Sequence, residues 1–173
     1  ERSRLALADG DLAVADVLSE RVLDGVRLVV ASACESGAAD VTRLPDEATG
    51  LPAALLQAGA AHVLGTLWPV SDLSASLLVS RVAAACLDPA AEPAAELAAA
   101  QRWLRGLSRD EAVSHARALV DAAGDRYRDV LEDDVVWLEL AGPELPFGQP
   151  RHWAPFVVVG EALRHLLDRD ETG

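Results

Sequence analysis

The stretch Arg27-Leu-Val-Val-Ala-Ser-Ala-Cys34-Glu-Ser-Gly37 decides the fold of this chain. It begins as a continuous apolar run and ends in small and polar residues. Such a run, closed by a turn signal, is typical of a strand buried in a parallel sheet. In open α/β sheets, ligands bind just beyond the carboxyl ends of the strands. The sequence therefore predicts a strand at about 27–32 that presents the Cys34 thiol at a cleft, where a nucleophile would sit.

Cys34 also has an ordinary interpretation. Free cysteine is among the most buried residue types, and most such residues only pack. The turn residues Glu35, Ser36 and Gly37 favour the nucleophile, because a cysteine buried for packing is more often followed by apolar residues. Gly37 also lets the backbone approach a substrate carbonyl closely. From the residues alone, both interpretations stay open.

The composition narrows the class of protein. The 173 residues suffice for one domain with its own core, and 51% of them are hydrophobic, as in globular proteins. The net charge of −13 disfavours nucleic acid and anionic membranes as partners, but it is compatible with a cationic or neutral peptide. Two cysteines do not make a disulfide framework, so a reducing cytoplasm is expected. No apolar stretch of about 18 residues predicts a membrane span.

Strand and helix patterns alternate along the chain, which predicts an α/β fold with a mostly parallel sheet. Asp9-Gly10 predicts a hairpin turn between two short strands. Strands are predicted at 5–7, 12–14, 27–32, 62–67 and 156–159, and helices at 16–23, 51–58, 71–87, 93–106, 108–123 and 125–134. Residues 38–50 are expected to form an exposed loop and the last dozen residues a tail helix, while 135–140 fit helix and strand equally. Three clear core strands are few for such a sheet and the chain contains no Met, so we expect its N-terminal part to be missing.

No cofactor is predicted from the residues. The two cysteines lie far apart and the histidines are scattered, so the spacing of a metal site is missing. No glycine-rich loop stands between a strand and a helix in the way that nucleotide binding requires. Cys86 lies in an alanine-rich helix pattern, where a structural role is expected.

A set of short segments covers nearly the whole chain. These are Leu7-Ala-Asp-Gly10, Leu28-Val-Val-Ala-Ser-Ala-Cys-Glu-Ser-Gly37, Gly50-Leu-Pro-Ala-Ala-Leu-Leu-Gln-Ala-Gly-Ala60, Val63-Leu-Gly-Thr-Leu-Trp-Pro-Val70 with Asp72, Ala99-Ala-Gln-Arg-Trp-Leu-Arg105, Pro146-Phe147 and Pro150-Arg-His-Trp-Ala-Pro-Phe-Val-Val-Val-Gly160. In order and spacing they resemble the CHAT family of caspase-like (clan CD) cysteine peptidases, often found behind tetratricopeptide repeats. The Ala-Cys-Glu-Ser-Gly core is also similar to the nucleophile turn of legumain-type peptidases.

The resemblance implies a single caspase-like domain over residues 1–173, with a three-layer α/β/α fold and Cys34 as the nucleophile. The Cys34 N–H would contribute to the oxyanion hole, within a turn completed by Glu35, Ser36 and Gly37. It also implies a bacterial, cytoplasmic hydrolase that acts on peptides or proteins without cofactor or metal. Repeats of the tetratricopeptide type would precede the domain in the same chain.

By the same resemblance, Leu67, Trp68, Pro69, Val70 and Asp72 would line the substrate cleft. Peptidases of this clan hold the peptide in extended form beside a strand edge. For Trp68 and Pro69, capping the core and ending the strand are equally good explanations. Asp72 could serve only as a first-turn acid favoured by the helix dipole, or it could select a basic residue before the cleaved bond.

The family's catalytic histidine, in a His-Gly pair one strand before the cysteine, has no match here. The chain contains His62, His115, His152 and His165, and none inherits that role. One explanation places the histidine upstream of Glu1, which the hairpin at 4–14 favours because it normally follows the histidine segment. The chain alone would then be inactive. Two alternative functions remain. The chain could be a catalytically inactive protein-interaction module, or a domain that binds a small ligand at the strand ends.

Overall fold

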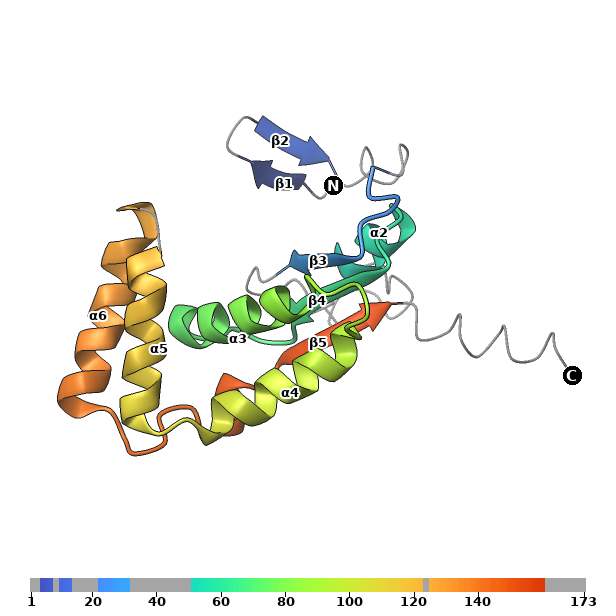
Figure 1. Cartoon of the computed structure of the whole chain (residues 1–173). Coiled ribbons are helices and arrows are strands. Elements are labelled where there is room, and N and C mark those ends of the chain that lie inside the picture. Colours follow the sequence, from blue (N-terminus) through green and yellow to red (C-terminus); the bar gives the residue numbers. More distant parts are fainter. Residues whose placement is uncertain (1–3, 8–9, 14–21, 32–50, 123–124, 161–173) are drawn as a thin grey trace, which may run out of the picture. The chain divides into compact units, whose positions relative to one another are not determined.

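Figure 1 shows the computed structural model of the chain, which describes residues 4–7, 10–13, 22–31, 51–122 and 125–160. The backbone divides into two compact units. The first consists of Glu1–Trp68 and Val157–Gly173, and the second of Pro69–Phe156. The α/β class predicted from the sequence is confirmed, since helices connect the strands of a sheet in which two neighbouring strands are parallel.

The first unit contains a three-stranded sheet. Its order is β3 (Leu28–Ala31), β4 (His62–Thr66) and β5 (Phe156–Gly160), with β4 in the centre. β3 and β4 are parallel. β5 runs antiparallel to β4 (Figure 1). Its last residue, Gly160, lies against His62, which is the first residue of β4. These are the three core strands that the apolar runs predict, and two of them share a direction.

A short helix packs beside this sheet. α2 (Leu51–Gln57) contributes Leu55 to an apolar cluster that also contains the fully buried Ala58 and Val63. The turn that follows the helix contains Gly59, which has φ +110°. A β-carbon there would lie 2.8 Å from the backbone nitrogen of Asp24, so only glycine fits. The glycine-terminated helix predicted at 51–58 is therefore confirmed.

The predicted hairpin is also present. β1 (Arg4–Leu7) and β2 (Gly10–Ala13) pair antiparallel, with Leu7 opposite Gly10. β2 begins at Gly10, the second residue of the Asp-Gly signal.

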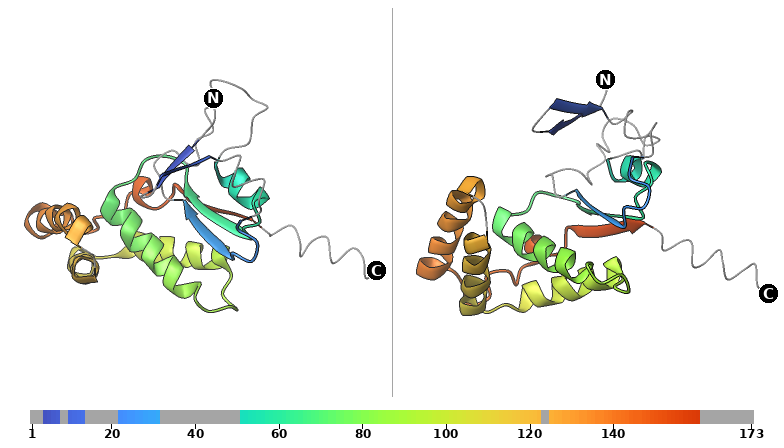
Figure 2. Two further views of the ribbon diagram at one scale, coloured as in Figure 1. Left: turned by 90° about the horizontal axis from the view of Figure 1, so that it is seen from above. Right: turned by 45° about the horizontal axis from the view of Figure 1, so that its top comes forward.

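The second unit is built from helices. They are α3 (Asp72–Ala85), α4 (Pro93–Gly106), α5 (Arg109–Ala122) and α6 (Asp125–Ala141), followed by the short 3-10 turn η1 (Pro150–His152). α5 and α6 lie side by side in both views of Figure 2, and α3 packs against α4 and α5. Ser71 caps α3, and Pro93 is the first residue of α4. α3 ends at Ala85, slightly before the predicted end at Leu87.

α6 settles the ambiguous stretch at 135–140 in favour of a helix. Its buried residues Leu131, Val135 and Leu138 recur at helical spacing. The exposed side chains of Val136, Trp137 and Leu140 place apolar residues on the opposite face as well. That distribution hides the helical period in the sequence.

Several predictions fall on residues that the structure does not describe. Residues 16–21 of the predicted first helix, the loop at 38–50 and the tail helix lie outside the described residues, and so do Cys34, Glu35, Ser36 and Gly37. The last two residues of that predicted helix, Val22 and Leu23, lie in a turn instead. The three-layer arrangement of the fold stays a prediction.

Candidate functional site

The described part of the site is the carboxyl edge of β3 and β4. The two strands are parallel and in register, with Ala31 opposite Gly65, so both end at the same edge of the sheet. The predicted nucleophile Cys34 is the third residue after Ala31, and Leu67 directly follows the last residue of β4. The predicted nucleophile segment and the predicted substrate segment thus leave neighbouring strands at one edge. Ligands gather at this edge in sheets of this class.

An exposed apolar pair follows the buried end of β4. Thr66 is fully buried, whereas Leu67 is 43% exposed and Trp68 is 40% exposed. Pro69 is exposed as well and Val70 is half-buried. Large apolar side chains that stay accessible directly after a buried strand offer a surface on which another chain can pack.

Thr66 was not singled out from the sequence, although it is the one hydroxyl residue in β4. Within the part of the chain that the structure describes, its Oγ1 is buried without a hydrogen-bond partner. Leaving a buried hydroxyl unpaired costs about 1–3 kcal/mol. The hydroxyl is therefore a polar group kept at the strand end at an energetic cost.

The start of α3 carries Asp72, the last residue of the predicted substrate segment. Ser71 caps the helix by accepting a hydrogen bond from the Ser74 backbone nitrogen at 3.3 Å. Asp72 is exposed in the first turn, where the helix dipole favours an acid. The negative charge of Asp72 affects the pKa of Asp134 on α6. Burial, and then the Asp72 carboxylate, raise the pKa of Asp134, while a hydrogen bond from the Leu73 backbone opposes the shift.

A cavity of about 230 Å³ opens beside this helix start. Asp134 and Trp137 line it from α6, and Phe147 and His152 line it from the segment that follows. The His152 and Phe147 rings meet edge to face with centroids 5.7 Å apart. Arg151 donates from Nε to His152 Nε2 at 3.1 Å, and burial together with the Arg151 charge lowers the pKa of His152. The neutral form of His152 is therefore favoured.

The sequence did not reveal this cavity. Asp134 and Trp137 are three positions apart, so they share a face only if residues 134–137 are helical. With the choice between helix and strand open at 135–140, their neighbourhood could not be predicted.

The histidines of the chain lie in different surroundings. The ring of His62 contacts the Arg27 carbonyl oxygen at 3.2 Å from the start of β4. It is thus about 13 Å along the strand from the carboxyl edge. His115 is exposed on α5, and its ring meets Trp103 edge to face with centroids 5.1 Å apart. His165 lies outside the described residues.

Two further observations concern the described residues alone. Among them, no three His, Cys, Asp or Glu side chains are grouped so that they could hold a metal ion. None of their helices combines the length and the apolar character that a membrane span requires.

Comparison with protein families identifies the class. The model of the CHAT domain matches residues 1–161, which is most of the chain. The chain therefore belongs to the CHAT domain family, a caspase-like family associated with peptidases, and the resemblance drawn from the sequence is confirmed. Neither the curated proteins nor the solved structures contain a match.

Proposed function

We propose that this chain is the C-terminal part of a caspase-like cysteine endopeptidase whose nucleophile is Cys34. Family membership over residues 1–161 is the observation that carries the proposal. The position of Cys34 supports it further, since three residues span at most about 11 Å and β3 ends at Ala31. The thiol is thereby tethered to the edge of the sheet where this class of fold does its chemistry.

The proposed reaction has two stages. The Cys34 thiolate attacks the carbonyl carbon of the scissile peptide, and backbone N–H groups of the 34–37 turn stabilise the oxyanion. The C–N bond then breaks, the amine takes up a proton and leaves, and a thioester joins Cys34 to the acyl half of the substrate. Water hydrolyses this thioester, which releases the carboxylic acid and restores the thiol.

The reaction needs a proton-transfer partner. A thiol with an ordinary pKa near 8.5 is only a few per cent ionised at neutral pH, and a histidine corrects this in cysteine peptidases. We place that histidine upstream of Glu1. His62 is not assigned this role, because it lies about 13 Å from the carboxyl edge along its strand and its ring contacts the Arg27 carbonyl.

Leu67, Trp68, Pro69 and Val70 are proposed to hold the substrate in extended form. The exposure of Leu67 and Trp68 supports this role, because both follow a buried strand end yet remain accessible. Asp72 is proposed to select a basic side chain. Its exposed carboxylate lies close enough to Asp134 to raise the pKa of that residue, so two acids share this part of the second unit.

The test uses the protein with the sequence that precedes Glu1. Cleavage of a peptide library should disappear with Cys34→Ala, with kcat/KM falling at least about a thousandfold. Cys86→Ala is the matched control, because Cys86 is the half-buried C-cap of α3 and should leave cleavage unchanged. Asp72→Asn should lower kcat/KM for substrates with Arg before the cleaved bond and spare those with Ala. Cleavage that survives Cys34→Ala would overturn the proposal.

The alternative is an interaction module that binds proteins without cleaving them. One observation favours it: the chain contains no His-Gly pair. In that case the substitution Cys34→Ala would leave the affinity of the longer protein for its partner unchanged, and neither the original protein nor the variant would cut that partner.

A further inference from the structure

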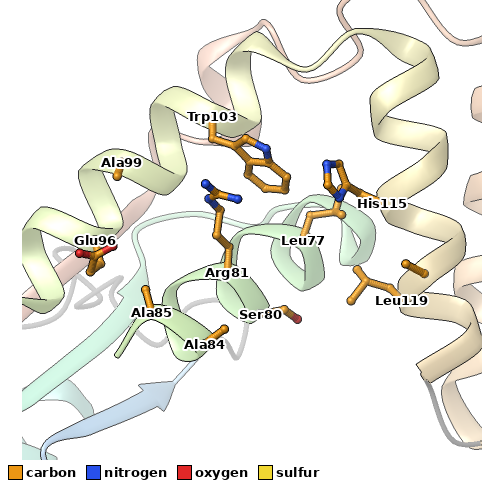
Figure 3. A pocket seen from close by; sticks show the side chains of 11 residues that line it. Leu77, Ser80, Arg81, Ala84, Ala85, Glu96, Ala99, Trp103, His115 and Leu119 are labelled. Carbon is orange, nitrogen blue, oxygen red and sulfur yellow. The ribbon is translucent and has the colours of Figure 1, made fainter. Parts of the chain in front are cut away.

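The second unit contains another cavity, of about 500 Å³, where α3, α4 and α5 meet (Figure 3). It shares no lining residue with the cavity beside the start of α3. Its volume falls within the range typical of small-molecule sites, about 300–1,000 Å³. None of the residues proposed for peptide cleavage lines it.

Small side chains create this space. Ala84 on α3, Ala99 on α4 and Ala118 on α5 all line the cavity. Ala84 and Ala118 are exposed and Ala99 is half-buried, so the cavity opens to solvent, and larger side chains at these three positions would fill it. Leu77 and Leu119 complete an apolar lining. The cavity suits a compact apolar body.

A cation stands at one end of the cavity. The guanidinium carbon of Arg81 lies 4.6 Å from the centre of the Trp103 ring, and the His115 ring meets the same tryptophan edge to face. In Figure 3 these three side chains point toward one another from three different helices. The ring attracts the cation but occupies none of its N–H donors.

The donors of Arg81 are available to a ligand. Within the described part of the chain, Arg81 contacts the Trp103 ring and has no ion pair or side-chain hydrogen bond. Glu96 also lines the cavity but lies two helical turns from Trp103 along α4, about 10 Å away. The cavity is thus lined by a cation at Arg81 and by an acid at Glu96, so the anionic group of a ligand is expected to lie at Arg81, away from Glu96.

We propose that this cavity binds a small organic anion, with its carboxylate, sulfonate or phosphate group on Arg81 and its apolar body among the alanine and leucine side chains. Guanidinium groups bind such anions through paired N–H donors, and the contact with Trp103 holds this one in place before the ligand arrives. His115 stands beside the same ring and offers a further N–H donor to the anion. The site is separate from peptide cleavage and independent of it.

The test titrates the full chain with two fluorescent probes of similar shape. 1-Anilinonaphthalene-8-sulfonate carries an anionic group, and N-phenyl-1-naphthylamine lacks it. The sulfonate should bind at one saturable site. Arg81→Gln should weaken its binding about tenfold or more, because a hydrogen bond to a charged group is lost, and should change the affinity of the neutral probe less than about twofold.

Three further variants keep the result unambiguous. Arg102→Gln removes an exposed charge from α4 that does not line the cavity, so it should leave both affinities unchanged. Ala99→Phe should fill the cavity and abolish binding of both probes, whereas Ala95→Phe on the exposed face of the same helix should not. Circular dichroism confirms that each variant is folded. The proposal is overturned if the sulfonate does not bind saturably, or if Arg81→Gln and Arg102→Gln weaken it equally.

Discussion

Gly59 illustrates how a single residue holds the first unit together. It lies in the turn that follows α2 with φ +110°, and a β-carbon at this position would collide with the backbone of Asp24. Gly59→Ala should destabilise the fold by about 1–3 kcal/mol from the backbone conformation alone, and the collision with Asp24 adds to that cost. Urea denaturation gives the free energy of unfolding.

Gly106→Ala is the matched control for this substitution. Gly106 is the last residue of α4, and a β-carbon there would meet nothing within 4 Å. Alanine should be neutral or should stabilise the protein by up to about 1 kcal/mol, because it favours helix more than glycine does. Equal losses at both positions would contradict the account of Gly59.

Asp134 gives a prediction about pH. Burial and the Asp72 carboxylate raise its pKa, so the folded state binds a proton there more tightly than the unfolded state does. Ionised Asp134 therefore lowers stability at neutral pH, and the penalty is relieved as the pH falls through its folded pKa. Asp134→Asn keeps an acceptor for the Leu73 N–H and should raise the melting temperature at pH 7.

The gain from Asp134→Asn should shrink as the pH approaches about 4, near the ordinary pKa of Asp. Glu132→Gln removes an acid from the exposed face of the same helix and should show no such pH-dependent gain. If the melting temperature of Asp134→Asn at pH 7 is unchanged or lower, the ionised Asp134 carboxylate does not destabilise the fold.

The roles of some residues can be predicted from the sequence. Ser108 and Glu111 form a capping box: the Ser108 N–H donates to Glu111 Oε2 at 2.9 Å. Ser108 Oγ donates to the same oxygen at 2.7 Å. These hydrogen bonds lower the pKa of Glu111. Such caps are local, so a spacing of three residues suffices to predict them. The approach of Asp72 to Asp134 joins distant positions and could not be predicted.

At the scale of elements, Gln101 attaches α4 to the chain that leads into β5. Its Nε2 donates to the carbonyl oxygens of Trp153 at 2.9 Å and Phe156 at 3.0 Å. The sequence marked Gln101 only as part of a family-like segment, because its partners lie about fifty positions away. The structure supplies the physical reason for an amide at this position: one group satisfies two carbonyls.

Gln101→Leu should destabilise the protein by about 2 kcal/mol or more, because two carbonyl oxygens lose their donor. Gln101→Glu has nearly the same shape but offers no donor when ionised, so it should be at least as damaging at neutral pH. Arg102→Gln, one position along on an exposed site, serves as control. Thermal unfolding decides, and a loss below about 0.5 kcal/mol for Gln101→Leu would contradict this role.

At the scale of the whole molecule, the α/β class and the family could be predicted because both follow from local signals in a fixed order. The strand runs at 28–31, 62–66 and 156–160 are short, apolar and closed by turn residues. The antiparallel direction of β5 could not be predicted in this way, since an apolar run does not encode its orientation. The cavity between α3, α4 and α5 depends on how those helices pack, which no single segment reveals.

The proposed peptide cleavage depends on Cys34 being an ionised nucleophile in the longer protein. The most direct measurement is labelling with a peptide acyloxymethyl ketone that ends in Arg, followed by mass spectrometry of the digested protein. We predict one label, on Cys34, formed with a pH midpoint well below the ordinary thiol value of about 8.5. Cys86 should stay unlabelled, and Cys34→Ala should remove the signal. A protein that is folded yet unlabelled at Cys34, or labelled equally at Cys86, would contradict the account.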